Sequence, residues 1–105
     1  MITYAKSVEE YNQLVDGKTV VVDFFATWCG PCKMLSPVIE QIDREHLVNC
    51  DFVKVDVDEL SQLAAKYGIN SIPTIIIFKD GEPKDMLLGY RGLPQLVDAI
   101  KKVIE

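Results

Sequence analysis

The stretch Trp28-Cys29-Gly30-Pro31-Cys32-Lys33 decides the fold and most of the chemistry of this chain. Two thiols separated by two residues close a very small disulfide ring, which restricts few residues of the unfolded chain. Such a ring stabilises a fold little, so the spacing favours reversible redox chemistry over a structural crosslink. An apolar run over residues 19–25 stops just before the motif, and a helical pattern starts just after it. A cysteine at a helix N-terminus lies where N–H groups and the helix dipole favour a thiolate.

Hydrophobic spacing on either side of the motif predicts the neighbouring elements. Residues 18–25 are almost continuously apolar, as in a central strand buried on both faces. Residues 31–45 are expected as a helix with one apolar face and a kink at Pro37. Before them, we expect an edge strand at residues 1–4 and a helix that starts at a capping box of Ser7 and Glu10 and ends at Gly17.

The second half of the chain continues the alternation. Residues 51–57 read as a third strand, and Asp58 is expected to cap a helix that runs through Tyr67. The pair Asp80-Gly81 is the strongest short hairpin signal in the chain. It is expected to join a fourth strand at 74–78 to an antiparallel fifth strand at 86–88, before a last helix at 94–104.

Strands that alternate with helices imply parallel pairing through right-handed crossovers, and the hairpin adds antiparallel strands. The expected fold class is therefore α/β, with a mixed five-stranded central sheet flanked by four helices on its two faces. At 105 residues, the chain is expected to form one domain over residues 1–105. The redox motif follows the C-terminal end of the second strand, where open α/β sheets place their active sites.

Composition excludes several classes of function. The chain is 49% hydrophobic and 26% charged, with a net charge of −5, which argues against nucleic acid and anionic membranes as partners. Its apolar runs are too short to span a bilayer, and no signal peptide is visible at residues 1–6. We therefore expect a cytoplasmic protein. Three cysteines in such a chain favour a transient redox or metal-binding role over structural disulfides.

The sequence resembles the thioredoxin family over essentially its whole length. The resemblance is carried by residues 22–33, Pro37, Lys54-Val55-Asp56, Ile72-Pro73-Thr74, Phe78-Lys79-Asp80-Gly81, Gly89 and Gly92. It implies the thioredoxin fold and a general protein disulfide reductase that is re-reduced by a flavin-containing reductase. It implies no metal and no bound cofactor beyond the redox-active Cys29–Cys32 disulfide. Disulfide-containing proteins are the expected substrates, and a monomer is the expected state.

Position assigns different tasks to the two thiols. Cys29 lies at the turn before the helix, where a partner reaches it, so it is the expected nucleophile. Cys32 lies one turn inside, where packing covers it, so it is the expected resolving thiol. The helix dipole contributes roughly 0.3–1 kcal/mol to a thiolate, which is less than one pKa unit. Hydrogen bonds to the Cys29 sulfur must supply the rest of its stabilisation.

Two charged residues are assigned by the resemblance. Asp23 interrupts an apolar strand, where an unpaired carboxylate is costly. In thioredoxins the matching Asp is buried behind the second cysteine and assists its proton transfers. Burial raises the pKa of such a carboxyl, which suits a base that works near neutral pH. Lys54 matches a Lys that lies near this Asp in the family and tunes its proton transfer. The alternative is that Lys54 is an exposed strand residue with no role in the chemistry.

The resemblance also implies a docking surface around Cys29. A cis peptide bond before Pro73 would place the backbone of Ile72 beside Cys29, free to pair with an extended substrate segment. Three residues differ from part of the family: Phe25 stands where some bacterial members have a second Trp, Tyr90 is larger than the residue often found there, and Cys50 is an extra thiol relative to many members. The expected apolar collar around the thiol consists of Trp28, Gly30, Pro31, Ile72, Leu88, Gly89 and Tyr90.

Parts of the sequence are also compatible with other functions. Cys29, Cys32, His46 and Cys50 have a spacing that superficially matches a zinc site. A helix over residues 32–46 would be about 21 Å long and would hold His46 far from the two thiols. The fold would also suit a binding module whose thiols are dispensable, or an oxidant or isomerase in an oxidising compartment. The Gly30-Pro31 pair favours the reductant, because oxidant relatives often carry a His there.

Overall fold

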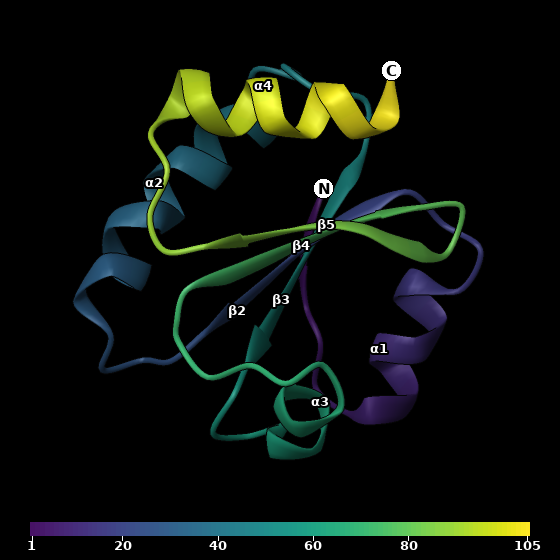
Figure 1. Cartoon of the computed structure of the whole chain (residues 1–105), viewed down its shortest axis with the longest axis vertical. Coiled ribbons are helices and arrows are strands. Elements are labelled where there is room, and N and C mark those ends of the chain that lie inside the picture. The colour runs from purple at the N-terminus through teal and green to yellow at the C-terminus, as the bar shows by residue number, and fades with distance from the viewer.

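The computed structural model describes residues 1–105 as one mixed sheet between two pairs of helices (Figure 1). The expected α/β class, with five strands and four helices, is confirmed. No helix has the combination of length and apolar character that crossing a membrane requires. The elements in chain order are β1 (Ile2–Tyr4), α1 (Val8–Val15), β2 (Val20–Phe25), α2 (Gly30–Arg44), β3 (Asp51–Asp56), α3 (Ser61–Lys66), β4 (Thr74–Lys79), β5 (Glu82–Leu88) and α4 (Leu93–Ile104).

The strands lie in the order β1-β3-β2-β4-β5. Strands β1, β2 and β3 are parallel, as alternation with helices predicts. Strand β4 runs antiparallel to both β2 and β5, so the hairpin supplies the antiparallel part of the mixed sheet, as expected. Residues 57–73, which include the six-residue α3, join β3 to the start of β4.

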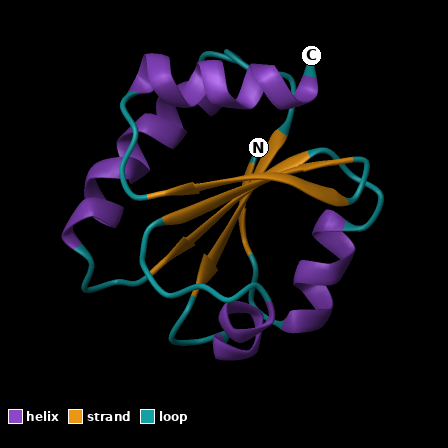
Figure 2. Cartoon of the chain, in the orientation of Figure 1, coloured by secondary structure: helices purple, strands orange, loops and turns teal.

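Helices cover both faces of the sheet, as Figure 2 shows. On one face, α1 and α3 pack through Tyr11, Val15 and Leu63 against alternate residues of β2 and β3. On the other face, α2 and α4 pack through residues such as Ile39 and Ile100. Because side chains alternate across a strand, neighbouring residues of β2 and β3 belong to different cores.

This alternation decides where the two charged strand residues point. In β2, Val22 and Phe24 face α1 and α3, so Asp23 faces α2. In β3, Val53 and Val55 face α1 and α3, so Lys54 also faces α2. The register of the parallel pair then sets Asp23 directly beside Lys54. The sheet thus brings both charges under the helix that carries the thiols.

Local signals set most of the remaining boundaries. The Ser7 hydroxyl accepts a hydrogen bond from the Glu10 N–H, as the capping box predicts, while the Glu10 carboxylate accepts from Lys6 rather than from Ser7. At the hairpin, Asp80 and Gly81 both have positive φ, the backbone that an Asp-Gly turn supplies.

The expected cap at Asp58 is wrong. Helix α3 starts later, at Ser61, after a turn over residues 57–60. The Asp58 carboxylate instead accepts a hydrogen bond from the Trp28 indole, at 2.8 Å. A partner thirty positions away in the chain leaves no local signal, so spacing alone assigned this carboxylate to the nearest helix.

Candidate active site

Cys29 is the N-cap residue of α2, and its sulfur serves as the capping atom. The Cys32 backbone N–H donates to Cys29 Sγ at 3.2 Å. The sulfur thus takes the place that a Ser or Thr hydroxyl oxygen occupies at an ordinary helix start. Pro31 lies in the first helical turn, where its missing N–H costs no helical hydrogen bond. A donor and the positive end of the helix dipole therefore converge on one sulfur, an environment that stabilises a thiolate.

Cys29 and Cys32 are joined by a disulfide, with their Cα atoms 5.2 Å apart. Cys29 is 4% exposed and Cys32 is 3% exposed, so the expected difference in accessibility is not present in this oxidised state. Both sulfurs lie in a small cluster with Ala26, against which Phe25, Val57 and Ile72 pack. Access to Cys29 therefore depends on the shape of the surface around it rather than on an exposed side chain.

The segment before β4 lies against the thiols. The Ile72–Pro73 peptide bond is cis, as the resemblance implied. The Ile72 carbonyl oxygen lies 3.7 Å from Cys29 Sγ. The Gly89 N–H donates to the Pro73 carbonyl oxygen at 2.8 Å, and Leu88 is the register partner of Thr74. Three segments far apart in the sequence, around residues 29, 72 and 89, thus meet at one place.

The surface beside Cys29 is apolar and exposed. Trp28 is 68% exposed, and Leu88 and Tyr90 are exposed as well, so Leu88 is not the core residue that its hydrophobicity alone would suggest. The indole hydrogen bond to Asp58 holds the Trp28 ring in place. None of the four hollows on the surface is lined by either active-site cysteine. An exposed apolar surface outside these hollows suits a protein segment better than a small molecule, which takes a concave pocket.

Asp23 and Lys54 form a buried ion pair on the α2 side of the sheet. Asp23 is 1% exposed and Lys54 is 4% exposed, with 3.7 Å between Lys54 Nζ and Asp23 Oδ2. Lys54 Nζ also donates to the Ser36 hydroxyl at 2.6 Å. Because Ser36 lies four residues after Cys32, the two share one face of α2. Lys54 therefore connects Asp23 to the helix face that carries Cys32.

Burial makes the Asp23 carboxyl a weaker acid than an ordinary aspartate. Removal from water raises the pKa of its carboxyl from 3.8 to about 6, and the attraction of the Lys54 ammonium limits that rise. Neither carboxylate oxygen has a hydrogen-bond partner within the protein. A carboxyl with a pKa near 6 exchanges protons readily near neutral pH, as a general acid or base must.

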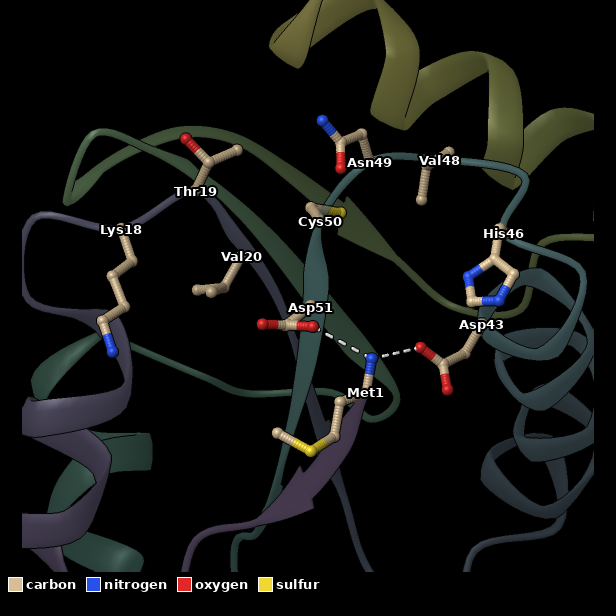
Figure 3. A pocket seen from close by; sticks show the side chains of 10 residues that line it. All are labelled: Met1, Lys18, Thr19, Val20, Asp43, His46, Val48, Asn49, Cys50 and Asp51. Carbon is tan, nitrogen blue, oxygen red and sulfur yellow. Dashed lines mark hydrogen bonds and ion pairs between the residues drawn. The ribbon is translucent and has the colours of Figure 1, made fainter.

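The other two residues of the zinc alternative lie at the opposite end of α2. His46 and Cys50 line a hollow with Asp43 and Asp51, and both carboxylates hold the N-terminal ammonium of Met1 (Figure 3). No three side chains of His, Cys, Asp or Glu are grouped as metal ligands would be. The four residues therefore do not form the site that their spacing suggested.

Cys50 is expected to be a poor nucleophile. Burial, reinforced by the nearby carboxylates of Asp51 and Asp43, raises the pKa of its thiol to about 11. In the disulfide form Cys50 is the one free cysteine, so alkylation reports on it alone. Iodoacetamide at pH 7.5 should modify it at least about tenfold more slowly than the same thiol in the unfolded chain. Mass spectrometry over time, with and without guanidinium, measures both rates; equal rates would contradict the shift.

Comparison with known proteins gives a consistent result. The family model described as Thioredoxin matches residues 2–102. A thioredoxin of Staphylococcus aureus is 43% identical over 93 residues, which cover 89% of each chain. The solved thioredoxin of Malassezia sympodialis has a TM-score of 0.87 at 41% identity and covers 97% of this chain and 90% of its own. A reduced thioredoxin pre-protein of Schistosoma mansoni has a TM-score of 0.84 at 40% identity, covering 98% of both chains.

Proposed function

Because this chain belongs to the thioredoxin family, we propose how its residues divide the work of thiol–disulfide exchange. The protein is a protein-disulfide oxidoreductase, and the Cys29–Cys32 pair is its redox-active group. One observation carries the assignment of roles: Cys29 Sγ caps α2, accepts the Cys32 N–H at 3.2 Å and lies beside the exposed apolar surface. Cys29 is therefore the nucleophile and Cys32 the resolving thiol.

The first step joins Cys29 to the target. In the reduced protein, the Cys29 thiolate attacks one sulfur of a target disulfide. A bond forms between Cys29 Sγ and that sulfur, and the target's other sulfur leaves as a thiolate that takes a proton from solvent. The Cys32 N–H and the dipole of α2 stabilise the negative charge of the attacking thiolate.

The second step releases the target. Asp23 in its carboxylate form takes the proton of the Cys32 thiol, and the Cys32 thiolate attacks Cys29 Sγ. The target's remaining sulfur leaves as a thiolate, so two electrons have passed from the dithiol to the target disulfide. Lys54 tunes the basicity of Asp23 through its charge. The Cys29–Cys32 disulfide seen here is the product.

Target proteins bind at the apolar surface. An extended segment lies against Trp28, Gly30 and Pro31, pairs with the backbone of Ile72 before Pro73, and contacts Leu88, Gly89 and Tyr90. The exposure of Trp28, Leu88 and Tyr90 supports these contacts, as does the Ile72 carbonyl 3.7 Å from the nucleophile. Glycines at positions 30 and 89 allow the target backbone to approach closely.

The cellular setting follows from the direction of electron flow. A thioredoxin reductase returns two electrons to the disulfide, which makes the protein an electron carrier that maintains redox homeostasis. A donor of electrons to protein disulfides works in a reducing compartment, which supports a cytoplasmic location. The family match over residues 2–102 supports a single thioredoxin domain, and we expect it to act as a monomer.

Equilibration with glutathione tests the direction of transfer. A Cys50→Ser variant should be used, so that only the active-site pair titrates. The reductase role predicts that the pair stays largely disulfide-bonded in buffers that already reduce the dedicated disulfide-forming proteins. Alkylation followed by mass spectrometry reads the dithiol fraction at each potential. A midpoint near about −120 mV, where those oxidants operate, would assign the chain to disulfide formation instead.

A further inference from the structure

One row of side chains crosses the sheet beneath α2. Tyr4, Lys54, Asp23 and Ile75 are register partners across four neighbouring strands. Ile75 is buried and apolar, so the sheet neighbour of Asp23 on that side offers no charge. Lys54 is the only cation within 4 Å of the Asp23 carboxylate. The position of the Lys54 ammonium along this row therefore governs the charge that Asp23 experiences.

The shortest polar contact of Lys54 is with a neutral group. Its Nζ lies 2.6 Å from the Ser36 hydroxyl and 3.7 Å from the Asp23 carboxylate, which is beyond hydrogen-bond length. The rings of Tyr4 and Phe25 hold the same ammonium at 5.4 and 5.1 Å from their centroids. Three neutral groups thus share the charge, and both Asp23 oxygens are left without a hydrogen bond.

We propose that Ser36 is a positioning residue for the exchange reaction: its hydroxyl holds the Lys54 ammonium away from Asp23 and so keeps that carboxyl an effective proton acceptor near neutral pH. A direct N–H⁺···O⁻ hydrogen bond stabilises a carboxylate strongly and would make Asp23 a weaker base. The inference deepens the proposed function and rests on Asp23 as the proton acceptor for Cys32.

The surroundings offer Lys54 few other partners. Helix α2 presents the Cys32 sulfur and the Ser36 hydroxyl on the face above the row. The hollow beside Lys54 is lined by the charged residues Lys6, Asp56 and Glu59. Neither carboxylate forms an ion pair with Lys54, and Lys6 forms none with Asp23, because Lys54 and Asp23 pair only with each other. Neither Asp23 oxygen has a hydrogen bond, and Oδ2 already lies 3.7 Å from Lys54 Nζ, so without the hydroxyl we expect the ammonium to move toward this carboxylate.

A Ser36→Ala variant tests this directly. Alanine is the best helix former, so the change does not endanger α2. The titration midpoint of the Asp23 carboxyl, followed by carbon NMR in the oxidised protein, should fall by about one pH unit from about 6. A Ser36→Thr variant keeps a hydroxyl and should titrate like the parent. An unchanged or raised midpoint in Ser36→Ala would overturn the inference.

A second pair of variants shows whether the effect passes through Lys54. Lys54→Met should raise the Asp23 midpoint, and adding Ser36→Ala to it should cause no further shift. A shift that persists without Lys54 would contradict the positioning role.

A kinetic readout separates the inference from the function on which it rests. The pH profile for resolution of a mixed disulfide should move with the Asp23 midpoint in Ser36→Ala. A midpoint that moves without the profile supports control of Asp23 by Ser36 but overturns Asp23 as the proton acceptor. If neither quantity moves in Ser36→Ala, and the pH profile still has its midpoint at that of Asp23, the result supports Asp23 as the acceptor and overturns the role of Ser36.

Discussion

A Cys32→Ser variant should accumulate as a covalent mixed disulfide with its target instead of turning over. The Cys29 thiolate still attacks, but no second thiol remains to break the bond that forms. Cys29→Ser should form no such adduct, because a neutral hydroxyl is a far weaker nucleophile than a thiolate. Both variants should reduce insulin at least about a thousandfold more slowly than the parent. Non-reducing electrophoresis detects the adduct, and turbidity of the released insulin chains measures the rate.

A matched Cys50→Ser variant should keep the parent's rate within about twofold, because its half-buried thiol lies outside the active-site cluster. Adducts on Cys29→Ser but not on Cys32→Ser would reverse the assigned roles. Biological activity retained in a Cys29→Ser, Cys32→Ser double variant would instead favour the binding-module alternative.

An Asp23→Asn variant should be more stable than the parent at pH 7 by about 3 kcal/mol. In the folded protein the pKa of this carboxyl is about 6, against 3.8 ordinarily, and each unit is worth about 1.4 kcal/mol. Between these two values the folded state binds more protons than the unfolded state, so stability falls as pH rises. Below pH 3 both states hold a neutral carboxyl, and the variant should match the parent. Urea unfolding from pH 3 to 7 measures the growing difference.

Asp98→Asn provides the matched control. Its side chain is 71% exposed on α4, so its pair with Lys102 is screened by solvent. The difference from the parent should stay within about 0.5 kcal/mol over the same range. If the difference in unfolding free energy between Asp23→Asn and the parent also stayed constant from pH 3 to 7, Asp23 would titrate as an ordinary carboxyl. That result would remove the physical basis for its proposed role as a base near neutral pH.

Most local features of the fold could be predicted because their causes lie within a few residues. The Ser7 cap, the Asp80-Gly81 turn and the sulfur-capped start of α2 each depend on neighbours three or fewer positions away. The buried strands were predicted in the same way, from apolar residues that follow one another in the sequence. The start of α3 was predicted less well, because a six-residue helix carries little periodic signal.

The candidate site divides in the same way. The sequence by itself determined the chemistry to expect, since two thiols two residues apart at the start of a helix favour reversible disulfide exchange. Only the tertiary structure decided what surrounds that pair. Strand register set Lys54 beside Asp23, and α2 packing brought Ser36 to the same ammonium. The indole N–H of Trp28 donates a hydrogen bond to the Asp58 carboxylate, thirty positions away in the chain. Such contacts depend on how sheets align and loops close, which spacing along a single chain does not encode.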